Sequence, residues 1–358
     1  MEKCFNSYDR NIIIMSESEQ ILRDRVGGVY MGQYLGDAFG TTYEFLSSKA
    51  AIGKLQKALD KNDDKFIPIL GKGPFGLVPG QVTDDTELAM GLVDAILNHS
   101  DGYIAIESIW ERAAWNYIMW YKSQPFDMGI TTSNALRYNT PEEVRHSAYA
   151  CNQESKSNGC VMRAFSLGIL GYILDDIELN SVIYNDCILT NPNPTAVDAV
   201  RVFVFAIRHL LKHGDRKLAY DEALRVCATD EIKNCLRVAA VQGDDVPCKG
   251  MFVKTDSQYQ GYAGVAIQNA FHELLNGDSF AQSIINIVSR GGDTDTNACI
   301  GGALLGAYYG QSAMPSEWIK VVKECKNPRV EKYPLISHEK IDADIKGLCN
   351  IVCNYEPM

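Results

Sequence analysis

Residues 21–40 read ILRDRVGGVYMGQYLGDAFG, and their apolar positions recur at helical spacing. Gly28, Gly32 and Gly36 stand at every fourth position of this stretch. Each glycine costs a helix interior up to about 1 kcal/mol, so we expect a closely packed neighbour to offset that cost. The segment 296–310, TNACIGGALLGAYYG, mixes small and apolar residues in the same way.

Helical patterns also dominate the rest of the chain. Clear amphipathic stretches lie at 86–98, 104–121, 196–212 and 262–276. The best alternating pattern, 203–207, lies inside a better helical one. Gly- and Pro-containing loops are predicted at 71–80, 124–129, 152–159, 191–194 and 243–250. We therefore predict an all-α fold, with a polar leader at 1–19 and one compact helical domain over 20–358.

Composition and charge narrow the classes of function. The chain has 358 residues, of which 46% are hydrophobic and 22% charged, an ordinary balance for a globular protein. Its net charge of −11 disfavours binding to nucleic acid backbones or anionic lipid. No apolar run approaches a membrane span of about 18 residues. The eleven cysteines include no CxxC pair, which favours reduced thiols. We expect a cytoplasmic monomer without membrane contact.

Two short segments, TDDT at 83–86 and DTDT at 293–296, follow loops and precede predicted helices. Helix capping is one interpretation, because Thr and Asp are favoured N-caps and acids suit a first turn. One cap needs only one such residue, however, and neighbouring carboxylates repel one another. A multivalent cation would remove that repulsion.

If the two acidic segments converge, they offer four carboxylates and several hydroxyl groups but no His or Cys. That ligand set favours magnesium or manganese over zinc or copper. Calcium is less favoured, because neither segment has the spacing of an EF-hand loop. Four carboxylates suffice for two ions that share ligands.

Five motifs follow one another along the chain. They are GDAFG at 36–40 with Glu44 and Phe45, TDDT at 83–86, FDMG at 126–129 followed by Thr131 and Thr132, SNG at 157–159 with Met162 and Arg163, and GGDTDT at 291–296. In this order and at these spacings they resemble the motifs of the ADP-ribosylglycohydrolase family. The resemblance spans residues 24–315, which is most of the chain.

The resemblance implies an orthogonal all-α domain that holds two Mg²⁺ ions, or Mn²⁺. It implies hydrolysis of the glycosidic bond between ADP-ribose and a protein side chain or a small acyl group. The implied metal ligands are Thr83, Asp84, Asp85, Asp293, Asp295 and Thr296. Glu44 would lie beside the metals, Asp127 would face the substrate, and Ser157, Asn158 and Gly159 would hold the diphosphate or ribose.

We expect three carboxylates to take part in catalysis, because of what each could bind or deprotonate. Glu44 or Asp295 could take a proton from water; we favour Glu44, which lies outside both acidic segments and need not be saturated by metal. Asp127 could accept a planar guanidinium, which favours arginine-linked substrates, although an Asp before Gly also closes turns.

The remaining substrate contacts are predicted around the SNG motif. Residues 157–159 could present N–H groups to a diphosphate, and a helix, if one starts at Cys160, would help with its positive end. A simple N-cap is the alternative interpretation of these residues. Cys160 and Met162 would line the pocket. Tyr262 could stack on adenine, but an aromatic residue beside glycines also suits a core. Where the family often has His after Thr, this chain has Asn191, whose role is left open.

Other activities stay open at this point. The substrate could be serine-linked or O-acetyl-ADP-ribose, or the chain could bind ADP-ribose without turnover. The same oxygen ligands would also suit a dinuclear phosphohydrolase that cleaves the diphosphate. The complete set of carboxylates favours an enzyme over a non-catalytic binder.

Overall fold

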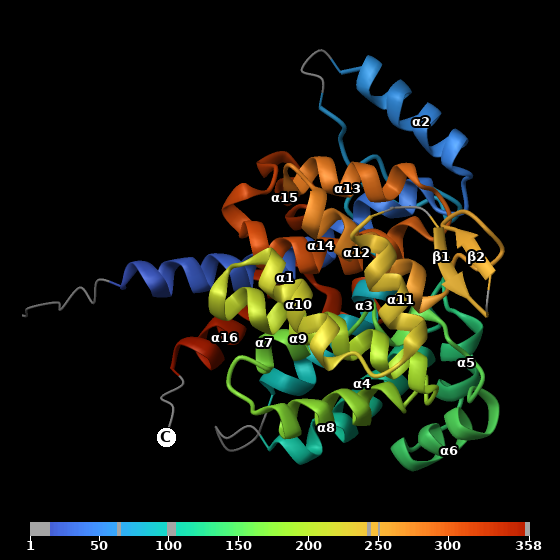
Figure 1. Ribbon diagram of the computed structural model, residues 1–358, viewed down its shortest axis with the longest axis vertical. Coiled ribbons are helices and arrows are strands. Elements are labelled where there is room, and N and C mark those ends of the chain that lie inside the picture. Colours follow the sequence, from blue (N-terminus) through green and yellow to red (C-terminus); the bar gives the residue numbers. More distant parts are fainter. Residues whose placement is uncertain (1–14, 63–65, 99–104, 242–244, 250, 355–358) are drawn as a thin grey trace, which may run out of the picture.

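The computed structural model describes residues 15–62, 66–98, 105–241, 245–249 and 251–354 (Figure 1). The first helix, α1, spans Glu17–Gly40, and Ser16 caps it by accepting the N–H of Glu19. The predicted boundary at residue 20 therefore lies inside α1. Most of the predicted leader, residues 1–14, lies outside the described residues, so the leader stays a prediction.

Apart from one two-stranded hairpin, the regular elements of the described residues are helices, so the all-α prediction is confirmed. After α1 follow α2 (Ser48–Asp60), α3 (Asp84–Leu97), α4 (Ile109–Lys122), α5 (Ile130–Leu136), α6 (Pro141–Cys151), α7 (Phe165–Leu170), α8 (Asp176–Cys187), α9 (Pro194–His213), α10 (Arg216–Val226), α11 (Asp230–Ala239), α12 (Ala263–Asn276), α13 (Phe280–Ser289), α14 (Thr294–Tyr309), α15 (Ser316–Lys323) and α16 (Ile341–Cys353). Short 3₁₀ turns include η1 (Thr41–Tyr43) and η3 (Asn158–Cys160).

At the centre, α1 and α14 run antiparallel at very close range (Figure 1). A Cβ added to Gly32 would lie 2.0 Å from the carbonyl oxygen of Gly302, and one added to Gly36 would lie 2.0 Å from that of Ala298. Only glycine permits this approach, which confirms the expected close neighbour of 21–40. The C-terminal end of α1 consequently lies beside the N-terminal end of α14.

Other helices surround this pair. α12 and α13 pack on α14, α9 packs on α7 and α10, and α4 packs on α3. The predicted helix at 104–121 begins only at Ile109 in the described part. The predicted loop at 243–250 is partly wrong, because β1 (Asp245–Cys248) pairs antiparallel with β2 (Met251–Lys254). This hairpin buries Val246 and Val253 against α11 and α12, beyond the reach of a helical pattern.

Two further features bear on the surroundings of the chain. No helix in the described ranges is long and apolar enough to cross a membrane. The described cysteines are free thiols, and most of them are buried. Buried thiols of this kind behave as small apolar side chains.

Candidate active site

The two acidic segments meet, as expected, at one cavity of about 210 Å³. α3 begins at Asp84 and α14 begins at Thr294, so both helices point their N-terminal ends toward it. Six carboxylate side chains line the cavity: Glu44, Asp84, Asp85, Asp127, Asp293 and Asp295. No lysine, arginine or histidine is among its described lining residues.

Asp37, on α1, holds the TDDT segment in place through hydrogen bonds. Its carboxylate accepts the backbone N–H groups of Thr83 and Thr86, each at 3.1 Å. Asp37 therefore satisfies N–H groups that the start of α3 leaves without an intrahelical partner. Because α1 is locked to α14, this contact also fixes α3 relative to the second acidic segment.

Asp85 is held by two neighbours. The Oγ1 of Thr83 lies 2.8 Å from Asp85 Oδ2, and the thiol of Cys299 donates to Asp85 Oδ1 at 3.2 Å. Thr83 is buried and is not among the cavity-lining residues, whereas Thr296, the other predicted threonine ligand, is. Cys299 lies on α14, so it links the second acidic segment directly to the first.

Asp295 is common to two groups of carboxylates. One group joins it to Asp37 and Asp85, and the other joins it to Glu44 and Asp127. Within each group the ligand oxygens all lie within 4.8 Å of one another. Two cation positions that share Asp295 would therefore be geometrically possible here.

Burial and mutual repulsion shift these acids strongly. Burial first, and neighbouring carboxylates second, raise the pKa of Asp84, Asp85 and Asp295 well above the usual range. The same causes raise the pKa of Glu44 to about 9 and that of Asp127 to about 6. Among the described residues that line the cavity, none is a cation that would keep all of these acids ionised.

Glu44 is held by its backbone neighbours. The N–H of Phe45 donates to Gly292 O at 2.8 Å, and the N–H of Gly292 donates to Leu46 O at 2.9 Å. Gly291 has a φ of 72°, and a Cβ there would lie 2.5 Å from Leu46 O. The glycines of the GGDTDT motif thus let the Glu44 segment lie against the second acidic segment.

The SNG motif forms the other wall. No helix starts at Cys160: residues 158–160 form the 3₁₀ turn η3, and the next helix, α7, begins at Phe165. Asn158 Nδ2 donates to Asp293 Oδ2 at 2.7 Å, and Asn191 Nδ2 donates to Ser157 Oγ at 2.9 Å. Asn191 therefore positions Ser157.

Only some of the residues predicted to contact the substrate line the cavity. Ser157, Asn158, Gly159 and Met162 line it. Cys160 does not: it is buried, and its thiol faces Ala196 O on α9. Tyr262 lines an adjacent pocket that shares Ser157 and Gly261 with the cavity.

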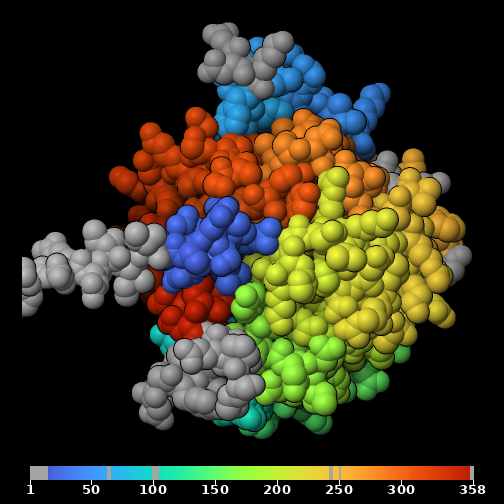
Figure 2. Space-filling model, turned by 60° about the vertical axis from the view of Figure 1, so that its left-hand side comes forward, coloured from blue at the N-terminus to red at the C-terminus, as the bar shows by residue number. Residues whose placement is uncertain are grey.

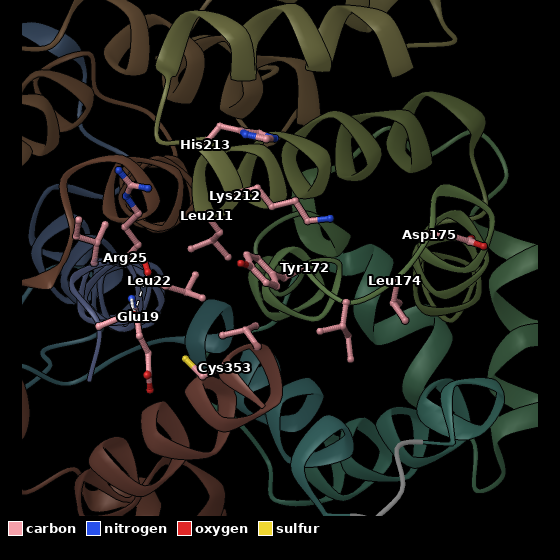
Figure 3. Close-up of a pocket in the computed structure, with 15 residues that line it drawn as sticks. Glu19, Leu22, Arg25, Tyr172, Leu174, Asp175, Leu211, Lys212, His213 and Cys353 are labelled. Carbon is pink, nitrogen blue, oxygen red and sulfur yellow. Dashed lines mark hydrogen bonds between the residues drawn. The ribbon is translucent and has the colours of Figure 1, made fainter. Parts of the chain in front are cut away.

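A larger cavity lies elsewhere, between α1, α9 and α16 (Figure 3). Its volume is about 970 Å³, and apolar side chains such as Leu22 and Leu211 mix there with Arg25 and Lys212. Of its two acids, Glu19 pairs with Arg23 and Asp175 caps α8. It offers no cluster of reactive groups comparable to the six carboxylates.

Comparison with known proteins identifies the family. Residues 18–349 match the ADP-ribosylglycohydrolase family. The chain belongs to the ADP-ribosylglycohydrolase family. A protein of Acanthamoeba polyphaga mimivirus that bears the name ADP-ribosyl glycohydrolase L543 is 32% identical over 87% of this chain and 94% of its own length. The ADP-ribosyl-[dinitrogen reductase] glycohydrolase of Rhodospirillum rubrum is 28% identical over 83% of this chain and 90% of its own.

Two further matches extend the comparison. The ADP-ribosylarginine hydrolase Tri1 of Serratia proteamaculans is 26% identical over 87% of this chain and 78% of its own. A solved structure entitled "ADP-ribosylglycohydrolase-related protein complex" superposes with a TM-score of 0.67 at 22% identity, over 93% of this chain and 99% of the other, and shows the shared fold. Membership of this family of glycosidic-bond hydrolases makes the chain an enzyme, as the motifs predicted.

Several residues of this ADP-ribosylglycohydrolase site were missed as site residues from the sequence. Asp37 has a possible signal, because it is the only charge within the apolar run 29–40. Cys299 has none, since its contact with Asp85 depends on helix packing. Phe45 and Ile130 are exposed side chains at the cavity, and exposure is not readable from their neighbours.

Proposed function

We propose that this chain hydrolyses the glycosidic bond between ADP-ribose and an arginine side chain of a protein, with two Mg²⁺ ions, or Mn²⁺, in the acidic cavity. The observation that carries the proposal is the placement of Asp295, whose carboxylate belongs to both groups of three carboxylates. Such sharing suits a pair of cations that would orient the ribose and activate a water molecule.

The residues present fit hard divalent ions. The carboxylates offer only oxygen ligands, and Glu44 Oε2 is buried without a hydrogen-bond partner among the described residues. Asp85 and Asp295 would hold the ions as members of the groups of three, and Asp84 and Asp293, which line the same cavity, would complete the ligand set with Thr296 at the rim. Glu44 and Asp127, the other members of the second group, would lie beside its ion and act on water and on the leaving group. Thr83 acts through its hydroxyl on Asp85. Bound there, the ions would supply positive charge that fixes the ribose hydroxyl groups and acidifies water.

Glu44 is the proposed proton acceptor. With its pKa raised to about 9, it holds a proton at neutral pH when only carboxylates surround it. Positive charge near Asp295 would favour its ionised form and free it to accept a proton from the attacking water. Its backbone clamp to Gly292 keeps the carboxylate at the cavity wall.

Asp127 would select the leaving group. It lies on the loop before α5, on the side of the cavity near Asp84, and is partly exposed. A carboxylate in this position could accept two N–H groups of a guanidinium. The Serratia relative bears the name ADP-ribosylarginine hydrolase, which is consistent with arginine linkage.

Ser157, Asn158 and Gly159 would hold the diphosphate or ribose along the opposite wall. Asn191 donates its side-chain N–H to Ser157 Oγ, which leaves the Ser157 hydroxyl hydrogen free to point at an anionic ligand. A neutral amide cannot change charge with pH, so this support stays constant across the physiological range. Met162 would provide an apolar contact at the same wall.

The test is to incubate the protein with arginine-ADP-ribosylated peptide and Mg²⁺ and to separate the products. We expect free, intact ADP-ribose, and a loss of release in Asp84→Asn with an unchanged circular dichroism spectrum. Serine-linked peptide and O-acetyl-ADP-ribose, assayed in parallel, rank the linkages. Tight ADP-ribose binding without release from any substrate would contradict hydrolysis, and AMP with ribose phosphate would instead indicate cleavage of the diphosphate.

A further inference from the structure

A second pocket, of about 460 Å³, lies between α2 and residues 68–72. Four lysines line it: Lys54, Lys57, Lys61 and Lys72. None of the described residues that line it is acidic, although the chain carries a net charge of −11. Figure 2 shows the α2 region as a projection from the body of the molecule.

These lysines lack anionic partners within the described ranges. Lys54 Nζ donates to the carbonyl oxygen of Thr42 and lies 5.4 Å from the ring centroid of Tyr43. Burial, and after it the charge of Lys72, lowers the pKa of Lys54. The two ammonium groups therefore repel one another in a partly desolvated place, and an anion between them would relieve that repulsion.

Ordinary surface roles explain only part of this cluster. Lys57 lies in the last turn of α2 and Lys61 follows it, where cations suit the helix dipole. That account does not cover Lys54, which is half-buried one turn earlier, or Lys72, which comes from a different segment. Asp60 is already engaged by Gln56 Nε2 at 2.8 Å.

We propose that this lysine pocket binds a small ligand that carries two or more phosphate groups. Lysine ammonium groups bind phosphate as point charges, and several of them around one pocket match a compact polyanion better than a single carboxylate. The volume lies within the range of about 300–1,000 Å³ that small-molecule sites occupy.

The lysine pocket is separate from the acidic cavity and is connected to it only along the chain, through η1. The two sets of lining residues have no member in common. Thr42 Oγ1 donates to Gly71 O at 3.0 Å, and Lys54 donates to Thr42 O, so both sides of the pocket are tied to η1. The chain leaves η1 directly into Glu44, which lines the acidic cavity.

Isothermal titration with inorganic pyrophosphate tests the proposal. The buffer contains EDTA and low salt, so that no divalent ion can carry the probe into the acidic cavity. We expect saturable binding at one site, weakened at least about tenfold in Lys57→Gln/Lys72→Gln because two nearby charges are lost. Both side chains are exposed and without described partners, so the fold should survive.

The matched control is Lys122→Gln/Lys217→Gln, which removes the same charge from exposed positions on α4 and α10. Its affinity for pyrophosphate should stay within about twofold of the parent chain, since distant exposed charges are screened. Equal weakening in both double variants, unchanged binding in Lys57→Gln/Lys72→Gln, or no saturable binding to the parent chain would each overturn the proposal. Thermal unfolding without ligand verifies that both variants are folded.

Discussion

Helix α3 carries two sets of buried acids, and the fold neutralises only one of them with a basic side chain. The carboxylate of Glu87 accepts hydrogen bonds from Arg329 Nε and Nη2, each at 3.0 Å, and from the indole N–H of Trp120 at 2.7 Å. Asp84 and Asp85, one turn earlier, face other carboxylates and no described basic lining residue. Buried charges are rarely left unpaired, so the fold compensates Glu87 internally and leaves the cavity to be compensated from outside.

The largest expected effect follows from removing the shared carboxylate. Asp295→Asn should lower ADP-ribose release on the order of 1,000-fold, because both cation positions lose a ligand. Without metal, its melting temperature should equal or exceed that of the parent chain, since one repelling charge is gone. Full activity in this variant would contradict the claim that both cation positions depend on Asp295.

The paired region should respond in stability instead. Arg329→Met leaves Glu87 buried and unpaired, which should lower the free energy of unfolding by about 3–5 kcal/mol. Urea unfolding measures this change. A shift comparable to that of an exposed substitution, such as Lys122→Gln, would mean that Arg329 does not compensate Glu87 in the folded protein.

The effect of Mg²⁺ on stability should depend on pH. The folded protein has raised carboxyl pKa values, about 6 for Asp37 and Asp127 and about 9 for Glu44. The stability that these groups contribute without metal is therefore complete below their unfolded values and lost as pH rises through 6 to 9. Cation binding offsets this loss, so the rise in melting temperature with Mg²⁺ should be larger at pH 8 than at pH 5.5. A larger rise at pH 5.5 would contradict this sign.

The smallest effect is expected from changing Cys299, whose thiol supports Asp85 of the first acidic segment. Cys299→Ala removes the thiol that donates to Asp85 and should weaken Mg²⁺ binding by about tenfold or less. Cys299→Ser keeps a donor at the same place and serves as the control. Identical affinities in the Ala, Ser and parent proteins, measured by titration, would show that the thiol does not orient Asp85.

Much of this arrangement was predictable where it depends on local pattern. The glycines at every fourth position of α1 predicted a closely packed neighbouring helix, and the TDDT and DTDT segments predicted the starts of two helices. The family resemblance then gave the order of the motifs. The contact of Asp85 with Asp295 was a hypothesis from residues about 210 apart, and only the α1–α14 packing brings them together.

Other features could not be predicted because they depend on which way a side chain faces. Cys160 directly follows the SNG motif, yet its thiol faces α9, and Tyr262 lines a neighbouring pocket. Asn191 looked like a departure from the family, but its amide holds Ser157. The hairpin β1–β2 lies in a stretch rich in turn residues, where strand pairing leaves a weak pattern.

Equilibrium titration of the metal-free protein with Mg²⁺ tests the central claim most directly. The account predicts two ions per chain, both dependent on Asp295, and unchanged stoichiometry in Lys122→Gln, a change at an exposed residue that does not line the cavity. No detectable binding of Mg²⁺ or Mn²⁺, or two ions bound equally well by Asp295→Asn, would contradict a cation pair held between the acidic starts of α3 and α14.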